Sequence, residues 1–88
     1  MLDSLTTPER ALAGTRVLDA AKGVLVVLRR CSLSEAFSEI LSVAAEYQVG
    51  PLAVSRALVD LAEGREVAWT TASQEAAHRA WAPLLANR

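Results

Sequence analysis

The side chains in this sequence that are most suited to a binding function are basic. Guanidinium and ammonium groups neutralise phosphates, so these residues are candidates for contacts with nucleic acid. Near the end of a helix they can instead complement the helix dipole, and for Arg29 and Arg30 both interpretations stay open. The 88-residue chain has a net charge of only −1, which excludes a general attraction to polyanions. The candidate residues are Arg16, Lys22, Arg29, Arg30 and Arg56.

Residues for enzymatic or metal chemistry are scarce. The chain has one histidine, His78, and one cysteine, Cys31, and its carboxylates are scattered. We find no catalytic triad, no metal-ligating cluster and no glycine-rich phosphate loop in the sequence. We therefore expect a protein that is not an enzyme and uses no cofactor.

Cysteine usage and hydropathy indicate the compartment. A single cysteine allows no internal disulfide, which is typical of cytoplasmic proteins. No apolar run approaches the ~20 residues that span a bilayer. The start of the chain, from Met1 to Ser4, lacks the basic and apolar regions of a secretory signal. The sequence predicts a cytoplasmic protein without membrane contact.

A long helix must position most of the basic residues. Thr7 and Pro8 are typical of a helix start, and an apolar period of 3.6 residues continues from there to about Arg30. The run "VLVVL" at 24–28 would by itself suit a buried strand, and a strand is the alternative. The helical period holds on both sides of the run, which favours the helix. Gly23 is expected to allow close approach of a neighbouring helix.

Local signals bound the next two helices. Ser32 and Glu35 have the spacing of a capping box, which predicts the start of the second helix. Gly50 and Pro51 suit the cap and first turn of the third helix. Gly64 suits its C-terminal end, where the backbone commonly turns left-handed.

The rest of the chain predicts one more helix. It starts at Thr71 or Ser73, and Pro83 must kink or end it. The hydrophobic content of 52%, mostly Ala, Leu and Val, also favours helices. We expect an all-α fold, a small three-helix bundle with a long first helix plus a C-terminal fourth helical segment. The expected parts are a lead (1–7), a three-helix domain (8–64), and a connector and helix (65–88).

Short motifs lie in the order and spacing of a known family. The first helix contains "AKG" at 21–23, the second opens with "SEAF" at 34–37, and the third contains "LAVSRALV" at 52–59. From about residue 15 to 61 the chain resembles an ANTAR domain, the RNA-binding module of bacterial antitermination regulators. The order of the pieces, rather than any single one, makes the resemblance specific.

The resemblance implies a function. Members of the family bind paired stem-loops in nascent RNA as dimers and prevent a transcription terminator from forming. On this chain the motif assigns RNA contact to Lys22, with Arg16, Arg29, Arg30 and Arg56 as the further basic groups. A sensor domain usually precedes the module in the family. On this chain we expect a separate sensor protein to be the partner that supplies this role.

A second interpretation stays open. The family often has an arginine where Leu41 stands, and the solvent face of the second helix is acidic through Glu35, Glu39 and Glu46. We expect these carboxylates to be solvated, and acidic groups oppose contact with phosphates. The alternative function is that of a degenerate ANTAR-like module, which serves only dimerisation or protein docking.

The apolar arc of the first helix predicts a partner for it. The arc spans roughly 180–200° of the helical wheel, whereas one core needs only about 100°. The surplus meets the C-terminal segment, a second chain, or both. Heptad spacing on this helix allows the seam of a homodimer. The expected interface residues are Leu18, Ala21, Leu25 and Leu28.

Overall fold

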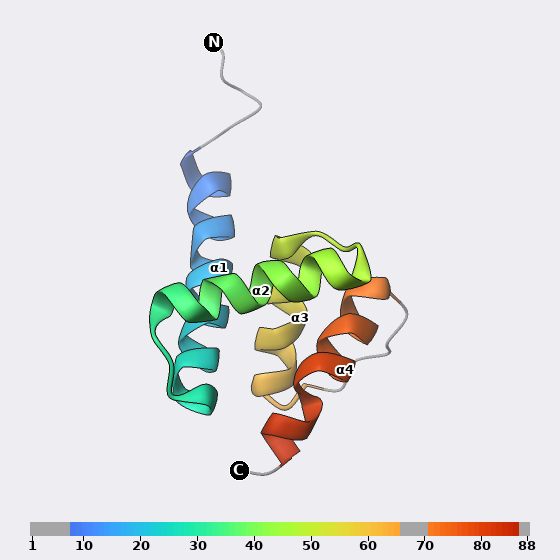
Figure 1. The fold of residues 1–88 in the computed structure, drawn as a ribbon. Coiled ribbons are helices and arrows are strands. Elements are labelled where there is room, and N and C mark those ends of the chain that lie inside the picture. The colour runs from blue at the N-terminus through green and yellow to red at the C-terminus, as the bar shows by residue number, and fades with distance from the viewer. Residues whose placement is uncertain (1–7, 66–70, 87–88) are drawn as a thin grey trace.

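The structure is a computed structural model that describes residues 8–65 and 71–86, with side chains from residue 14 onward. Within these ranges the chain forms α1 (Pro8–Arg29), α2 (Leu33–Tyr47), α3 (Pro51–Ala62) and α4 (Ala72–Ala86) (Figure 1). The described residues contain no strand, and the run at 24–28 is helical. The predicted all-α fold is therefore confirmed.

The start of α2 is fixed by its own sequence. The Ser32 hydroxyl accepts a hydrogen bond from the backbone N–H of Glu35 at 3.0 Å, and the Glu35 carboxylate accepts one from the N–H of Ser32 at 2.9 Å. This is the predicted capping box, which satisfies two backbone donors that a helix start leaves unpaired.

Three helices are followed by a residue in the left-handed conformation, Arg30 after α1, Gln48 after α2 and Gly64 after α3. After α3, Gly64 has a φ of 78°, and the N–H of Arg65 reaches back to the carbonyl of Asp60 at 3.1 Å. After α2, Gln48 takes the same conformation, with a φ of 57°, although it has a side chain. Glycine adopts this region without steric cost and glutamine does not, so the end of α2 carries local strain.

The fourth helix differs in part from the prediction. Its start is capped by Thr71, whose hydroxyl accepts a hydrogen bond from the N–H of Gln74 at 3.1 Å. Pro83 does not end the helix, which continues to Ala86. Proline removes one hydrogen bond, to the carbonyl four residues earlier, which belongs to the exposed residue Arg79.

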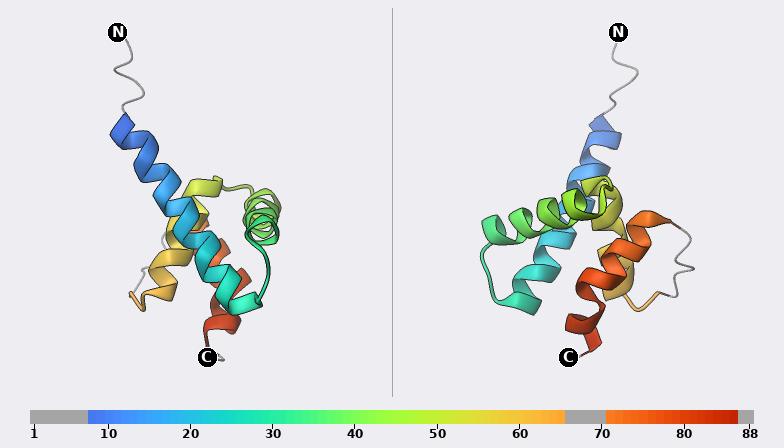
Figure 2. Two further views of the ribbon diagram at one scale, coloured as in Figure 1. Left: turned by 90° about the vertical axis from the view of Figure 1, so that its left-hand side faces the viewer. Right: turned by 45° about the vertical axis from the view of Figure 1, so that its right-hand side comes forward.

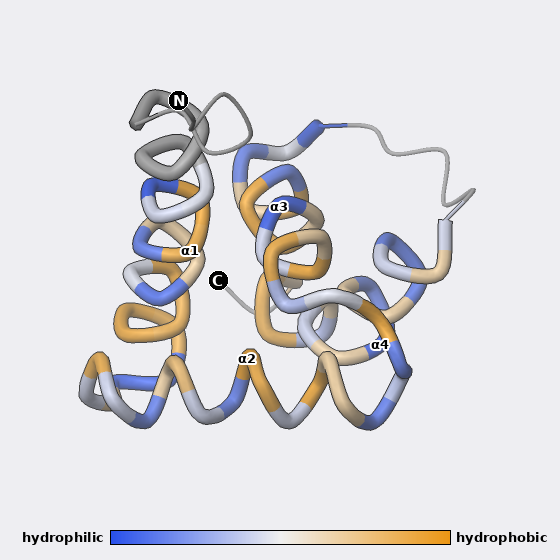
Figure 3. The backbone as a smooth tube through the Cα atoms, turned by 90° about the horizontal axis from the view of Figure 1, so that it is seen from above, coloured by the Kyte–Doolittle hydropathy of each residue, from blue (hydrophilic) through white to orange (hydrophobic). Residues whose placement is uncertain are grey.

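The four helices share one core. α1 and α3 lie side by side, α2 crosses one side of both, and α4 packs against α2 and α3 (Figures 1 and 3). The turns of α1 before Gly14 project from the bundle (Figures 1 and 2). α4 contributes buried residues as the other helices do, so it belongs to the bundle rather than being appended to it. The core consists of Ala21, Leu25, Ala36, Ile40, Val43, Ala44, Val54, Ala57, Leu58, Ala76, Ala77 and Trp81.

Candidate nucleic-acid interface

Two of the candidate arginines line the same hollow between α1 and α3. Arg16 and Arg56 line one hollow of about 290 Å³, together with Val17, Ala20 and Val59. Both arginines are exposed, and neither forms an ion pair with any residue that the structure describes. The arrangement places two uncompensated guanidinium groups beside an apolar floor.

The lysine of the "AKG" motif has structural partners. Its ammonium lies 3.2 Å from the Asp19 carboxylate and 5.3 Å from the centre of the Phe37 ring. The Lys22 side chain is only 22% exposed. A cation over an aromatic ring is attracted to it, so Lys22 helps to hold α1 against α2. Its charge is already partly satisfied within the chain.

Arg29 is also engaged. Its guanidinium donates hydrogen bonds to both carboxylate oxygens of Glu39, at 2.9 to 3.1 Å. The same carboxylate accepts a hydrogen bond from the indole N–H of Trp81 at 2.8 Å. The expectation that Glu39 belongs to a solvated acidic face is therefore wrong. It joins α1, α2 and α4, and it neutralises Arg29.

Arg30 stands apart from the other candidates. It is exposed, has a φ of 54° just after α1, and forms no ion pair with the described residues. It lies 14 residues beyond Arg16, which is on the order of 21 Å along a helix. Among the candidates, the structure therefore brings only Arg16 and Arg56 together.

The expected dimer seam does not match the surface of the single chain. Ala21 and Leu25 have no exposed area, because α1 packs its heptad positions into the bundle core. Leu18 and Leu28 are partly buried. Two of the four expected residues are thus unavailable to a second copy in this conformation, and the seam must be revised.

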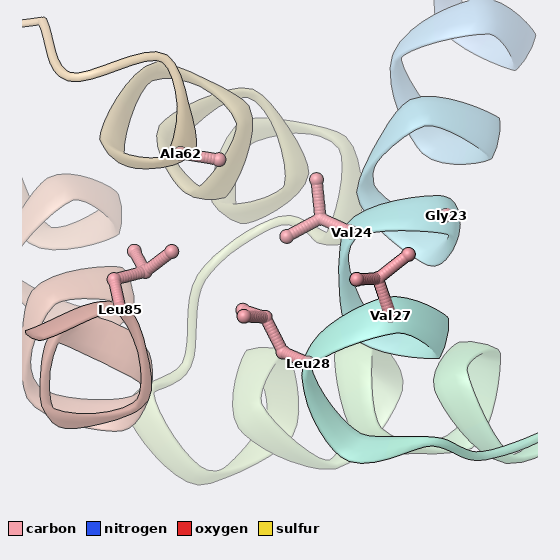
Figure 4. A pocket seen from close by; sticks show the side chains of 6 residues that line it. All are labelled: Gly23, Val24, Val27, Leu28, Ala62 and Leu85. Carbon is pink, nitrogen blue, oxygen red and sulfur yellow. The ribbon is translucent and has the colours of Figure 1, made fainter. Parts of the chain in front are cut away.

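A different face of α1 is left open. Val27 is 75% exposed, and an added Cβ on Gly23 would meet no atom of the described residues within 4 Å. The expectation that Gly23 allows close approach of a neighbouring helix is therefore wrong for the described part of the chain. Val24, Leu28 and Leu85 point toward a common hollow of about 340 Å³, with Ala62 at its rim (Figure 4). The excess width of the apolar arc was the sequence signal for this surface, but it did not say which residues would be left open.

The two hollows lie along the same face of α1. On that helix, Arg16, Val17 and Ala20 line one, and Gly23, Val24, Val27 and Leu28 line the other. α3 contributes Arg56 and Val59 to the first and Ala62 to the second. Leu85 of α4 completes the second hollow, and we call the two hollows together the α1–α3 groove. It has a cationic end and an apolar end.

The described residues hold no group of three or more metal-ligating side chains. Within the same ranges, every helix is too short or too polar to cross a membrane. Comparison with models of known families, with curated proteins and with solved structures gives no match to this chain.

Proposed function

We propose that this chain is an RNA-binding regulator of transcription antitermination of the ANTAR type. The motifs at 21–23, 34–37 and 52–59 support the family. The observation that carries the proposal is that Arg16 and Arg56 line one hollow and form no ion pair with the side chains that the structure describes. Charged groups left uncompensated at a concave surface favour a ligand of opposite charge.

The cationic end of the groove suits the loop of an RNA stem-loop. Unpaired loop bases can turn outward and stack on aromatic side chains or arginine planes, and an extruded base can also lie against apolar side chains, whereas duplex RNA hides its base edges. In this proposal one base lies on Val17, Ala20 and Val59, and the two guanidinium groups bind the flanking phosphates. Arg30, which lies away from the hollow, binds a further phosphate of the RNA in this proposal.

Lys22 and Arg29 take an indirect role in this proposal. Their contacts with Phe37 and Glu39 position α1 against α2, and so support the α1 face that carries Arg16. The lysine of the motif thus contributes mainly to the scaffold. This assignment differs from the one that the resemblance implies.

In this proposal two copies of the chain form a dimer through α1, as members of the family do. Ala21 and Leu25 are in the core, so pairing uses the N-terminal turns, which project from the bundle (Figure 2). A dimer would present two cationic ends to two stem-loops of one cytoplasmic transcript. Control by a ligand or phosphate would come from a separate sensor protein.

A gel-shift experiment tests the proposal. The probe is a transcript with two adjacent stem-loops, and the variant is Arg16→Ala/Arg56→Ala. We expect its affinity to fall at least about tenfold, and the salt slope to decrease by about 1 for each phosphate that the variant no longer neutralises. The matched control, Arg65→Ala/Arg79→Ala, removes the same charge from residues that pair with Asp60, Glu63 and Glu75.

Equal loss of affinity in both double variants would mean that only net charge matters, and would refute the site. Absence of any shift by the unaltered protein at low salt would refute RNA binding itself. The alternative, a docking module, is favoured by one observation, the apolar end of the groove. That end has no part in the contacts with RNA.

A further inference from the structure

We propose that the α1–α3 groove is a docking site for an acidic amphipathic helix of a partner protein. The apolar end of the groove motivates this. Val27 is 75% exposed beside a hollow lined by Val24, Leu28, Ala62 and Leu85 (Figure 4). Contact with a partner would remove this apolar surface from water.

The spacing of the groove residues fits a helix as occupant. On α1 they recur every three or four residues, at Val17, Ala20, Val24 and Val27. From Arg16 to Leu28 the face is about 18 Å long, which corresponds to three turns of a docked helix. Helix-in-groove recognition uses anchors with the same three-to-four-residue spacing on the partner.

The charges of the groove select the partner. Arg16 and Arg56 stand at one end, so the docked helix needs carboxylates at the matching end. The α1 helix of a second copy would not supply them. Lying parallel, it would place its own Arg16 against this pair, and lying antiparallel it would bring Arg30 there, which forms no ion pair with the described residues. Like charges at these positions disfavour a second copy and favour an acidic partner.

Docking would also affect the proposed RNA site. The helix and the RNA share Arg16 and Arg56, so a bound helix excludes RNA. This consequence rests on the proposed function, whereas the docking itself does not. A partner of this kind would hold the regulator in a state that cannot bind RNA.

Fluorescence anisotropy with a labelled peptide tests the docking without RNA. The peptide has about 14 residues, leucines on one face at helical spacing and glutamates at one end. We expect binding with a Kd in the micromolar range, and at least about fivefold weaker binding of the same peptide with glutamine for glutamate. Chemical-shift changes in the protein should map to α1, α3 and Leu85 of α4, and spare α2.

Protein variants make the test specific. Val27→Asp should weaken binding at least about tenfold, while Leu33→Asp, a matched change at an exposed leucine of α2, should leave it unchanged. The charge-reversal variant Arg16→Glu/Arg56→Glu should no longer bind the glutamate peptide, and it should bind the same peptide with lysine in place of glutamate. Circular dichroism verifies that each variant is folded.

Three results would overturn the proposal. They are no binding up to about 1 mM, a Val27→Asp variant that binds as well as the unaltered protein, and no gain of the lysine peptide after charge reversal. A protein dimer that Val27→Asp dissociates would assign the groove to a second copy instead. Peptide binding that does not compete with RNA, or a protein that binds no RNA, would remove only the regulatory consequence.

Discussion

The indole N–H of Trp81 donates a hydrogen bond to the Glu39 carboxylate at 2.8 Å, across 42 residues of sequence. The Glu39 carboxylate also accepts hydrogen bonds from the Arg29 guanidinium, so a single carboxylate connects α1, α2 and α4. Trp81 is fully buried, and its N–H has the Glu39 carboxylate as its acceptor among the described residues. This network makes the C-terminal helix an integral part of the bundle.

Removal of the Glu39 carboxylate should destabilise the fold. Glu39→Ala leaves the buried indole donor of Trp81 unpaired, and we expect the free energy of unfolding to fall by about 2 kcal/mol. Urea denaturation measures it. In the control Glu75→Ala, which breaks an exposed pair with Arg79, the change should stay within about 0.5 kcal/mol. Equal changes in the two variants would contradict the role of the network.

Relief of the left-handed strain after α2 should stabilise the protein. Gln48 has a φ of 57°, a conformation that glycine adopts without steric cost. We expect Gln48→Gly to raise the free energy of unfolding by about 1 kcal/mol, and thermal denaturation to show a higher Tm. The opposite change at the equivalent place after α3, Gly64→Ala, should lower it by a similar amount. A Gln48→Gly variant of lower stability would show that the glutamine side chain contributes more than the strain costs.

The hydroxyl of Ser55 is a second source of instability. Ser55 is fully buried in α3, and its Oγ has no hydrogen-bond partner in the part of the chain that the structure describes. An unpaired buried polar group is costly, so Ser55→Ala should stabilise the protein by about 1 kcal/mol. Chemical denaturation checks this, and Ser38→Ala on the exposed face of α2 is the control, expected near zero. Loss of stability on Ser55→Ala would mean that the hydroxyl is paired.

Gly23 should tolerate a methyl group in the isolated chain. An added Cβ meets no atom within 4 Å, and alanine is the better helix former by about 1 kcal/mol, so Gly23→Ala should raise the Tm. At Gly14 an added Cβ would lie 3.3 Å from Leu52, so Gly14→Ala should gain less. A marked loss of stability in Gly23→Ala would imply a contact that the single chain does not contain, for example with a second copy.

The sequence by itself determined where the helices begin and end at several places. The capping box of Ser32 and Glu35, the Gly50–Pro51 start and the left-handed Gly64 are confirmed, because each depends on atoms a few residues apart. The local signal was a poorer guide at Pro83, because the helix continues past the proline. The missing hydrogen bond falls at Arg79, which is an exposed residue, and sequence spacing does not reveal exposure.

Tertiary structure alone decided which charged and apolar residues remain open. Arg29 is neutralised by a carboxylate ten residues away, on the next helix. Arg16 of α1 and Arg56 of α3, by contrast, line the same hollow. The apolar arc of α1 was visible in the sequence, but an arc of roughly 180–200° contains several faces of equal hydrophobicity. Packing against α2, α3 and α4 buried Ala21 and Leu25 and left Val27 in solvent. Such outcomes depend on the relative orientation of helices, which helical periodicity does not encode.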